Sequence, residues 1–67
     1  MIKSITREIY HHLDPDKPMT AAGACRLVDN VLYNEAMDSL EWLASKGFAI
    51  MVGTGPFGRE YVRAMRG

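Results

Sequence analysis

The sequence predicts a mainly α-helical protein that ends in a β-hairpin. Up to Gly47, apolar residues recur at spacings of three and four, which is the period of one helical face. Beyond Gly47, "FAIMV" and "EYVRAM" are rich in residues typical of strands, and they flank "GTGPFG", whose glycines and proline favour a loop. A chain of 67 residues has room for one domain, which we place at residues 1–67.

The first predicted helix covers about residues 3 to 13. Its apolar side chains fall within a narrow stripe of one helical face: Ile2, Ile5, Ile9 and Leu13. "DPDKP" ends this helix, because Asp14 precedes a proline and that position is biased away from helical geometry.

The second predicted helix covers residues 21 to 28, with Thr20 as its N-cap. One face of it carries small or apolar residues: Ala21, Ala24, Cys25 and Val28. Such a face suits close packing against another helix, and we expect the following turn near Asp29 and Asn30.

The third predicted helix covers residues 32 to 46 and turns Ala36, Leu40 and Leu43 inward. It ends where Gly47 can adopt the left-handed conformation. Asn30 and Asn34 are both candidate N-caps, so its start lies anywhere from residue 31 to residue 35.

The predicted hairpin pairs Phe48–Val52 with Glu60–Met65 across a loop of about six residues. The predicted core combines apolar residues of all these elements: Ile5, Ile9, Leu13, Leu27, Leu40, Leu43 and Phe48.

This order of elements resembles the winged helix-turn-helix superfamily over residues 20–65. The matching features are the capped helix "TAAGACRLV", the helix "EAMDSLEWLASKGF" and a wing ending in "GREYV". The resemblance implies that the third helix enters the major groove of DNA and that the wing touches the flanking backbone. It also implies a small phage or bacterial type of transcription regulator, which would dimerise to cover a useful length of double-stranded DNA.

The net charge, the cysteine content and the absence of long apolar segments limit the possible partners and the cellular compartment of the protein. Eight basic and eight acidic residues give zero formal charge, so any basic footprint for nucleic acid must be local. The single cysteine, Cys25, fits a reducing compartment and a place in the core. Without an apolar leader or spanning segment, we expect a cytoplasmic protein that does not contact membranes.

The face of the third helix opposite Leu40 is unusually acidic for a DNA-reading surface. At about 100° per residue it displays Glu35, Asp38, Ser39, Trp42 and Ser45, with Lys46 beside them. Carboxylates attract a polyanion poorly, although they also suit the N-terminal end of any helix. Trp42 is either an interface anchor or an indole covered by the chain itself.

The wing carries the better candidates for nucleic-acid contact. Arg59, Arg63 and Arg66 recur near its second strand, and with Lys46 they can meet phosphates; Ser39 is the candidate on the third helix. The alternative is an ordinary solvated strand face. Phe57 at the tip can stack on a base, fill a partner's pocket or fold back onto Tyr61.

We expect neither an enzyme nor a bound cofactor or metal. His11 and His12 are adjacent and therefore do not form the i, i+4 pair that binds a metal, and Cys25 has no identifiable histidine partner.

Two functions remain. The favoured one is a small DNA-binding regulator, and the alternative is a protein-interaction module that uses Glu35, Asp38, Trp42 and Phe57. Either one can involve a homodimer.

Overall fold

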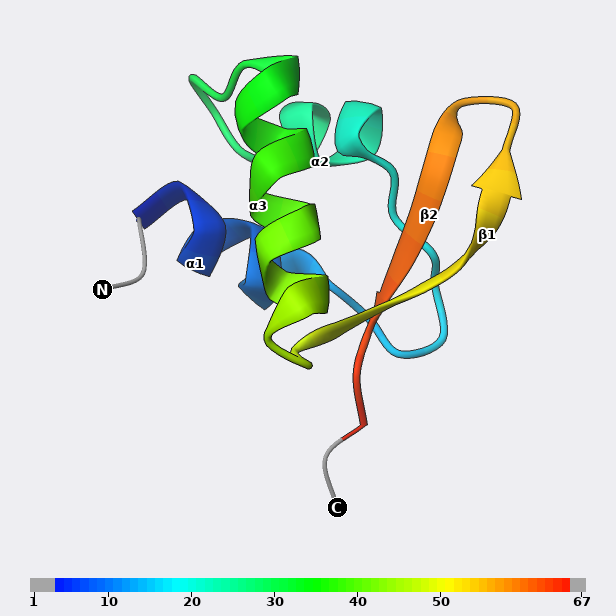
Figure 1. Cartoon of the computed structure of the whole chain (residues 1–67). Helices are drawn as coiled ribbons and strands as arrows, with labels where there is room; N and C mark the ends of the chain where they lie inside the picture. The colour runs from blue at the N-terminus through cyan, green and yellow to red at the C-terminus, as the bar shows by residue number, and fades with distance from the viewer. Residues whose placement is uncertain (1–3, 66–67) are drawn as a thin grey trace.

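Three helices are followed by a C-terminal antiparallel hairpin, as the sequence predicts (Figure 1). The structure is a computed structural model, and it describes residues 4–65. Its elements are α1 (Ser4–His12), α2 (Ala21–Leu27), α3 (Tyr33–Ser45), β1 (Ala49–Gly55) and β2 (Gly58–Arg63). α3 packs against both other helices, and the hairpin lies to one side of it (Figure 1). This layout is compatible with a winged helix. Two sequence predictions, the first helix starting at Lys3 and a phosphate contact by Arg66, lie outside the described residues.

The predicted signals at the start of α2 and the end of α3 are confirmed. Thr20 caps α2, because its hydroxyl accepts the N–H of Gly23 at 3.1 Å. α3 ends at Ser45, and Gly47, which follows the C-cap Lys46, has a left-handed φ of 82°. There the N–H of Gly47 donates to the carbonyl of Ala44 and the N–H of Phe48 to that of Leu43, the two bonds of a Schellman motif.

The start of α3 falls within the predicted range, but both predicted N-caps are wrong. Leu32 occupies the N-cap position, and the carboxylate of Glu35 accepts its N–H at 3.1 Å. Asn30 instead adopts a left-handed φ of 61° in the turn after α2, a conformation that asparagine tolerates better than most residues.

The hairpin pairs the two predicted segments, but its strands run over Ala49–Gly55 and Gly58–Arg63 and its loop is shorter than predicted. Its register places Ala49 opposite Arg63 and Met51 opposite Tyr61, with a bulge before Gly53. The ladder then continues to Gly55 opposite Gly58, so the loop is the dipeptide Pro56–Phe57 and not about six residues. Gly58 makes this tight turn possible with a φ of 104°.

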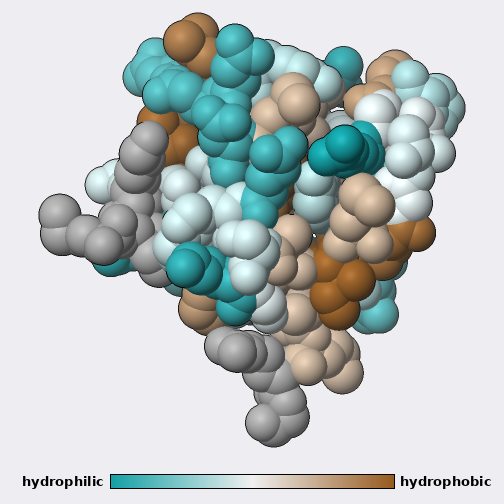
Figure 2. Space-filling model, in the orientation of Figure 1, coloured by the Kyte–Doolittle hydropathy of each residue, from teal (hydrophilic) through white to brown (hydrophobic). Residues whose placement is uncertain are grey.

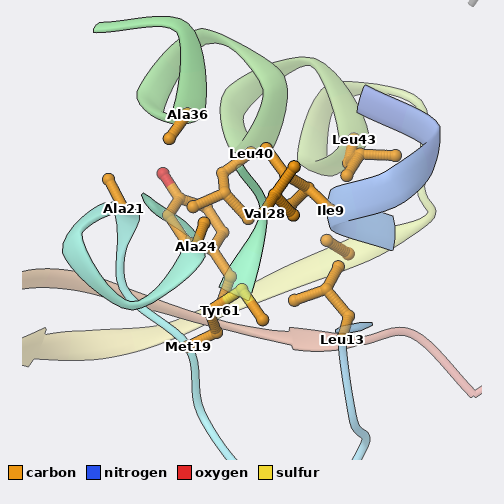
Figure 3. Packing of buried hydrophobic residues seen from close by; sticks show 11 residues of the cluster. Ile9, Leu13, Met19, Ala21, Ala24, Val28, Ala36, Leu40, Leu43 and Tyr61 are labelled. Atoms are coloured by element: carbon orange, nitrogen blue, oxygen red, sulfur yellow. The ribbon is translucent and has the colours of Figure 1, made fainter. Parts of the chain in front are cut away.

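The core lies where α1, α2 and α3 meet the inner face of the hairpin (Figure 3). Ile9, Leu40 and Leu43 are fully buried at its centre, as predicted. Met19 ties the loop before α2 to the sheet, because its N–H and C=O exchange hydrogen bonds with Tyr61 at 2.7 and 2.8 Å.

One predicted core residue is wrong and two are less buried than expected. Leu27 is 53% exposed, because the buried face of α2 is made by Ala21, Ala24 and Val28, and Leu27 points away from that face. Ile5 and Phe48 are partly buried at the edge of the core.

Candidate functional site

The exposed face of α3 differs from the predicted one by roughly a quarter of a turn. Its exposed stripe is Asn34, Asp38, Glu41 and Ser45. Figure 2 shows hydrophilic residues along α3 and a hydrophobic patch over the hairpin to its right. This exposed face of α3 is acidic as predicted, but it is rotated toward the hairpin relative to the predicted face.

Ser39, a predicted nucleic-acid contact, is not on this surface. It is 5% exposed, and its hydroxyl lies 2.9 Å from that of Thr6, which is equally buried. The two hydroxyls satisfy each other where α1 packs on α3. The placement of Ser39 on the outer face is therefore wrong.

Trp42 is packed against its own chain. The indole is half-buried and stacks on Phe48 with ring centroids 6.3 Å apart and planes 14° from parallel. The ammonium group of Lys46 lies 5.9 Å from the indole centroid. Of the two interpretations of Trp42, this geometry favours the one in which the indole is covered by its own chain. Lys46 remains exposed beside it.

A groove runs between α3 and the hairpin. Tyr33 and Met37 on α3 face Thr54 and Phe57 of the hairpin across it. At its rim, Arg59 donates to Glu41 at 3.5 Å, and both side chains are at least half exposed. Phe57 at the tip is 74% exposed.

Arg63 lies on the same side of β2 as Arg59, and that side faces the helices. Its guanidinium donates to the carbonyl of Tyr10 at 2.9 Å and sits 4.5 Å from the centroid of that ring. It also reaches the carbonyl of His11 at 3.5 Å. Arg63 therefore closes the C-terminal end of α1, and neither predicted role, phosphate contact nor solvated strand face, describes its position.

Sequence reasoning missed most of the groove. Tyr33, Met37 and Glu41 follow one another at i, i+4 and i+8, so they form a stripe beside the core positions of α3. This spacing is the sequence feature that could have identified the groove. Of the predicted partner-binding residues, Phe57 lines the groove and Asp38 lies beside it on α3, whereas Glu35 is engaged at the helix start.

Within residues 4–65, no three His, Cys, Asp or Glu side chains are grouped so as to hold a metal ion. No helix in this part of the chain has the length and apolar character that a membrane span requires.

Comparison of the chain with protein-family models, with curated proteins and with solved structures found no match.

Proposed function

We propose that this chain is a winged-helix protein-interaction module that binds a partner protein in the groove between α3 and the hairpin. The observation that carries the proposal is the charge on the groove side of α3. Glu41 forms an ion pair with Arg59, and Asp38 adds a further carboxylate on α3. Carboxylates at these positions repel phosphates, which disfavours the approach of this face of α3 to DNA.

The apolar character of the groove supports the same proposal. Met37 and Phe57 are exposed on its walls, and both residue types are enriched at protein interfaces. Charged side chains at the rim around an apolar centre are the usual arrangement of such interfaces.

Site-directed photo-crosslinking tests this function. A benzophenone amino acid replaces Met37 in the groove or, as the control, Glu8 on the exposed face of α1. We expect the groove position to crosslink one protein in lysate of the source cells, and the control position not to do so. Charge reversal by Glu41→Arg in the crosslinking protein should abolish that product. The same product from both positions, or its persistence in the charge-reversed variant, would contradict the proposal.

Duplex DNA binding is the second candidate function. It is favoured by Arg59 and Phe57, a cation and an aromatic ring that lie exposed near the tip of the wing, where winged-helix proteins touch DNA. A gel shift on random duplex DNA distinguishes this function from protein binding. A shift that is lost in Arg59→Ala, together with the absence of a groove crosslink, would show that the wing binds DNA.

A further inference from the structure

The two strands of the hairpin differ in what lies along their outer edges. The outer edge of β2 is covered, because Tyr61 exchanges two backbone hydrogen bonds with Met19 there. β1 pairs with β2 on one side, and no other strand or bridge of residues 4–65 pairs with its second side. Figure 1 shows β1 on the side of β2 that is turned away from α2. One edge of β1 is therefore open.

The hydrogen bonds of Tyr61 identify the first backbone groups that point to this open edge. In an antiparallel ladder, two residues that lie opposite each other exchange either both hydrogen bonds or none. Tyr61 directs its N–H and C=O toward Met19, so it forms no ladder bond with Met51, the residue opposite it in β1. The N–H and C=O of Met51 therefore point away from β2.

Thr54 directs a second N–H and C=O to the same edge. Gly55 and Gly58 close a two-residue loop as a hydrogen-bonded pair, so the next pair, Thr54 and Arg59, is not hydrogen-bonded. The bulge before Gly53 adds one residue to β1, which keeps Thr54 on the same edge as Met51 although they are three positions apart. None of these outward groups is bonded to another residue that the structure describes.

The composition of β1 leaves this edge without protection by charge. Edge strands are commonly protected from pairing by charged residues, by proline or by a bulge. β1 has the bulge, but Ala49–Gly55 contains no charged residue and no proline. Ile50, Met51 and Val52 are 51%, 50% and 51% exposed. An uncharged edge with exposed apolar side chains favours pairing with another extended chain.

A second copy of β1 matches this edge residue by residue. When two copies run antiparallel about a two-fold axis, Met51 of each lies opposite Thr54 of the other, and both pairs exchange their hydrogen bonds. A strand without the bulge has one residue fewer over this interval and leaves Val52 unopposed. In the second copy, Gly53 stands opposite Val52, and the space beside Gly53 is open, since an added Cβ would meet no described atom within 4 Å.

We propose that this chain forms a two-fold symmetric homodimer in which the β1 strands of two copies pair antiparallel along their open edges. No like charges face each other across the axis, because β1 is uncharged, and the zero net charge of the chain adds no long-range repulsion. The dimer goes beyond the proposed function and does not depend on it, because the pairing uses the edge of β1 and the groove lies between α3 and the hairpin.

Sedimentation equilibrium of the purified full chain tests the self-association. Between about 1 μM and 1 mM, the measured mass should rise from that of one chain to that of two. The mass of a single chain over the whole range would overturn the proposal. So would a mass that continues to rise beyond two chains, because a two-fold pairing of the β1 edges is closed.

Amide hydrogen exchange, followed by NMR, locates the interface without any substitution. The N–H groups of Met51 and Thr54 should exchange about tenfold or more slowly in the dimer than in the dilute monomer, because they become hydrogen-bonded. Arg59 is the internal control, since its N–H points to the opposite edge of the hairpin and should exchange equally in both states. A dimer in which the amides of Met51 and Thr54 are not slowed would place the interface elsewhere and overturn the proposal.

Lysine substitutions test the edge by charge. Met51→Lys should keep the chain monomeric at concentrations where the wild type is dimeric, because a lysine on an edge strand opposes pairing. Met65→Lys is the matched control: residue 65 lies outside β1 and is 82% exposed, so this variant should dimerise as the wild type does. If far-UV circular dichroism shows that Met51→Lys does not fold, Val52→Lys makes the same test beside the axis. A folded edge variant that dimerises like the wild type would contradict the proposal.

Discussion

Trp42 lies half-buried between the ring of Phe48 and the ammonium group of Lys46. From the sequence, the indole can be an interface anchor, and its loss would then weaken association and leave the fold intact. The stacking on Phe48 changes the expectation. Trp42→Ala should lower the free energy of unfolding by about 2 kcal/mol, roughly half the cost of truncating a fully buried aromatic residue.

Urea unfolding followed by far-UV circular dichroism measures this change without relying on the indole. Trp42→Phe is the control, because it keeps a ring against Phe48 and should recover most of the stability. If Trp42→Ala instead leaves the unfolding midpoint unchanged and abolishes partner capture, the indole is an interface anchor.

Residue positions were predictable where the period alone decides them. Ile9, Leu40 and Leu43 fall on apolar stripes and are buried. Ser39 and Arg63 were not predictable, because their partners Thr6 and Tyr10 lie far away in the chain and only tertiary packing brings them together.

The helix α3 and the hairpin meet at Gly47, which the sequence identified as a helix end. An added Cβ there would meet no described atom within 4 Å, so the cost of substitution is conformational and arises from the φ of 82°. Gly47→Ala should therefore lower the free energy of unfolding by about 1 kcal/mol.

Gly53 supplies the matched control for Gly47. An added Cβ at Gly53 also meets open space, and its φ lies outside the left-handed region. Gly53→Ala should be neutral or slightly stabilising, because alanine restricts the unfolded chain. Equal urea midpoints for the two variants would show that the conformation at Gly47 costs alanine nothing.

The hairpin shows why loop length was less predictable than strand pairing. Three glycines and a proline in "GTGPFG" favour a loop by composition, yet Gly53 and Gly55 continue the ladder opposite Glu60 and Gly58. Glycine lowers strand propensity by tenths of a kcal/mol to about 1 kcal/mol, and pairing between the strands offsets that cost. The rotation of α3 was missed for a related reason, since one helical period fits several rotations equally well until a neighbouring element is in place.

On the scale of the whole molecule, the net charge of zero and the placement of the cations limit any attraction to DNA. Three cations near the wing imply a slope near −3 for log affinity against log salt, at about 0.9 per phosphate contact. Arg63 is engaged with Tyr10, which leaves Lys46 and Arg59 exposed on this side of the described chain. The slope should therefore be no steeper than about −2.

Fluorescence anisotropy on a random duplex, measured over a series of salt concentrations, gives this slope. Arg59→Ala should reduce it to about −1, because one phosphate contact is lost. Arg63→Ala should leave it unchanged while lowering the unfolding midpoint, because Arg63 closes the end of α1 and does not face the ligand. A slope near −3 that becomes shallower in Arg63→Ala would mean that this guanidinium leaves Tyr10 to contact DNA. The wing, and not the acidic face of α3, would then carry the function.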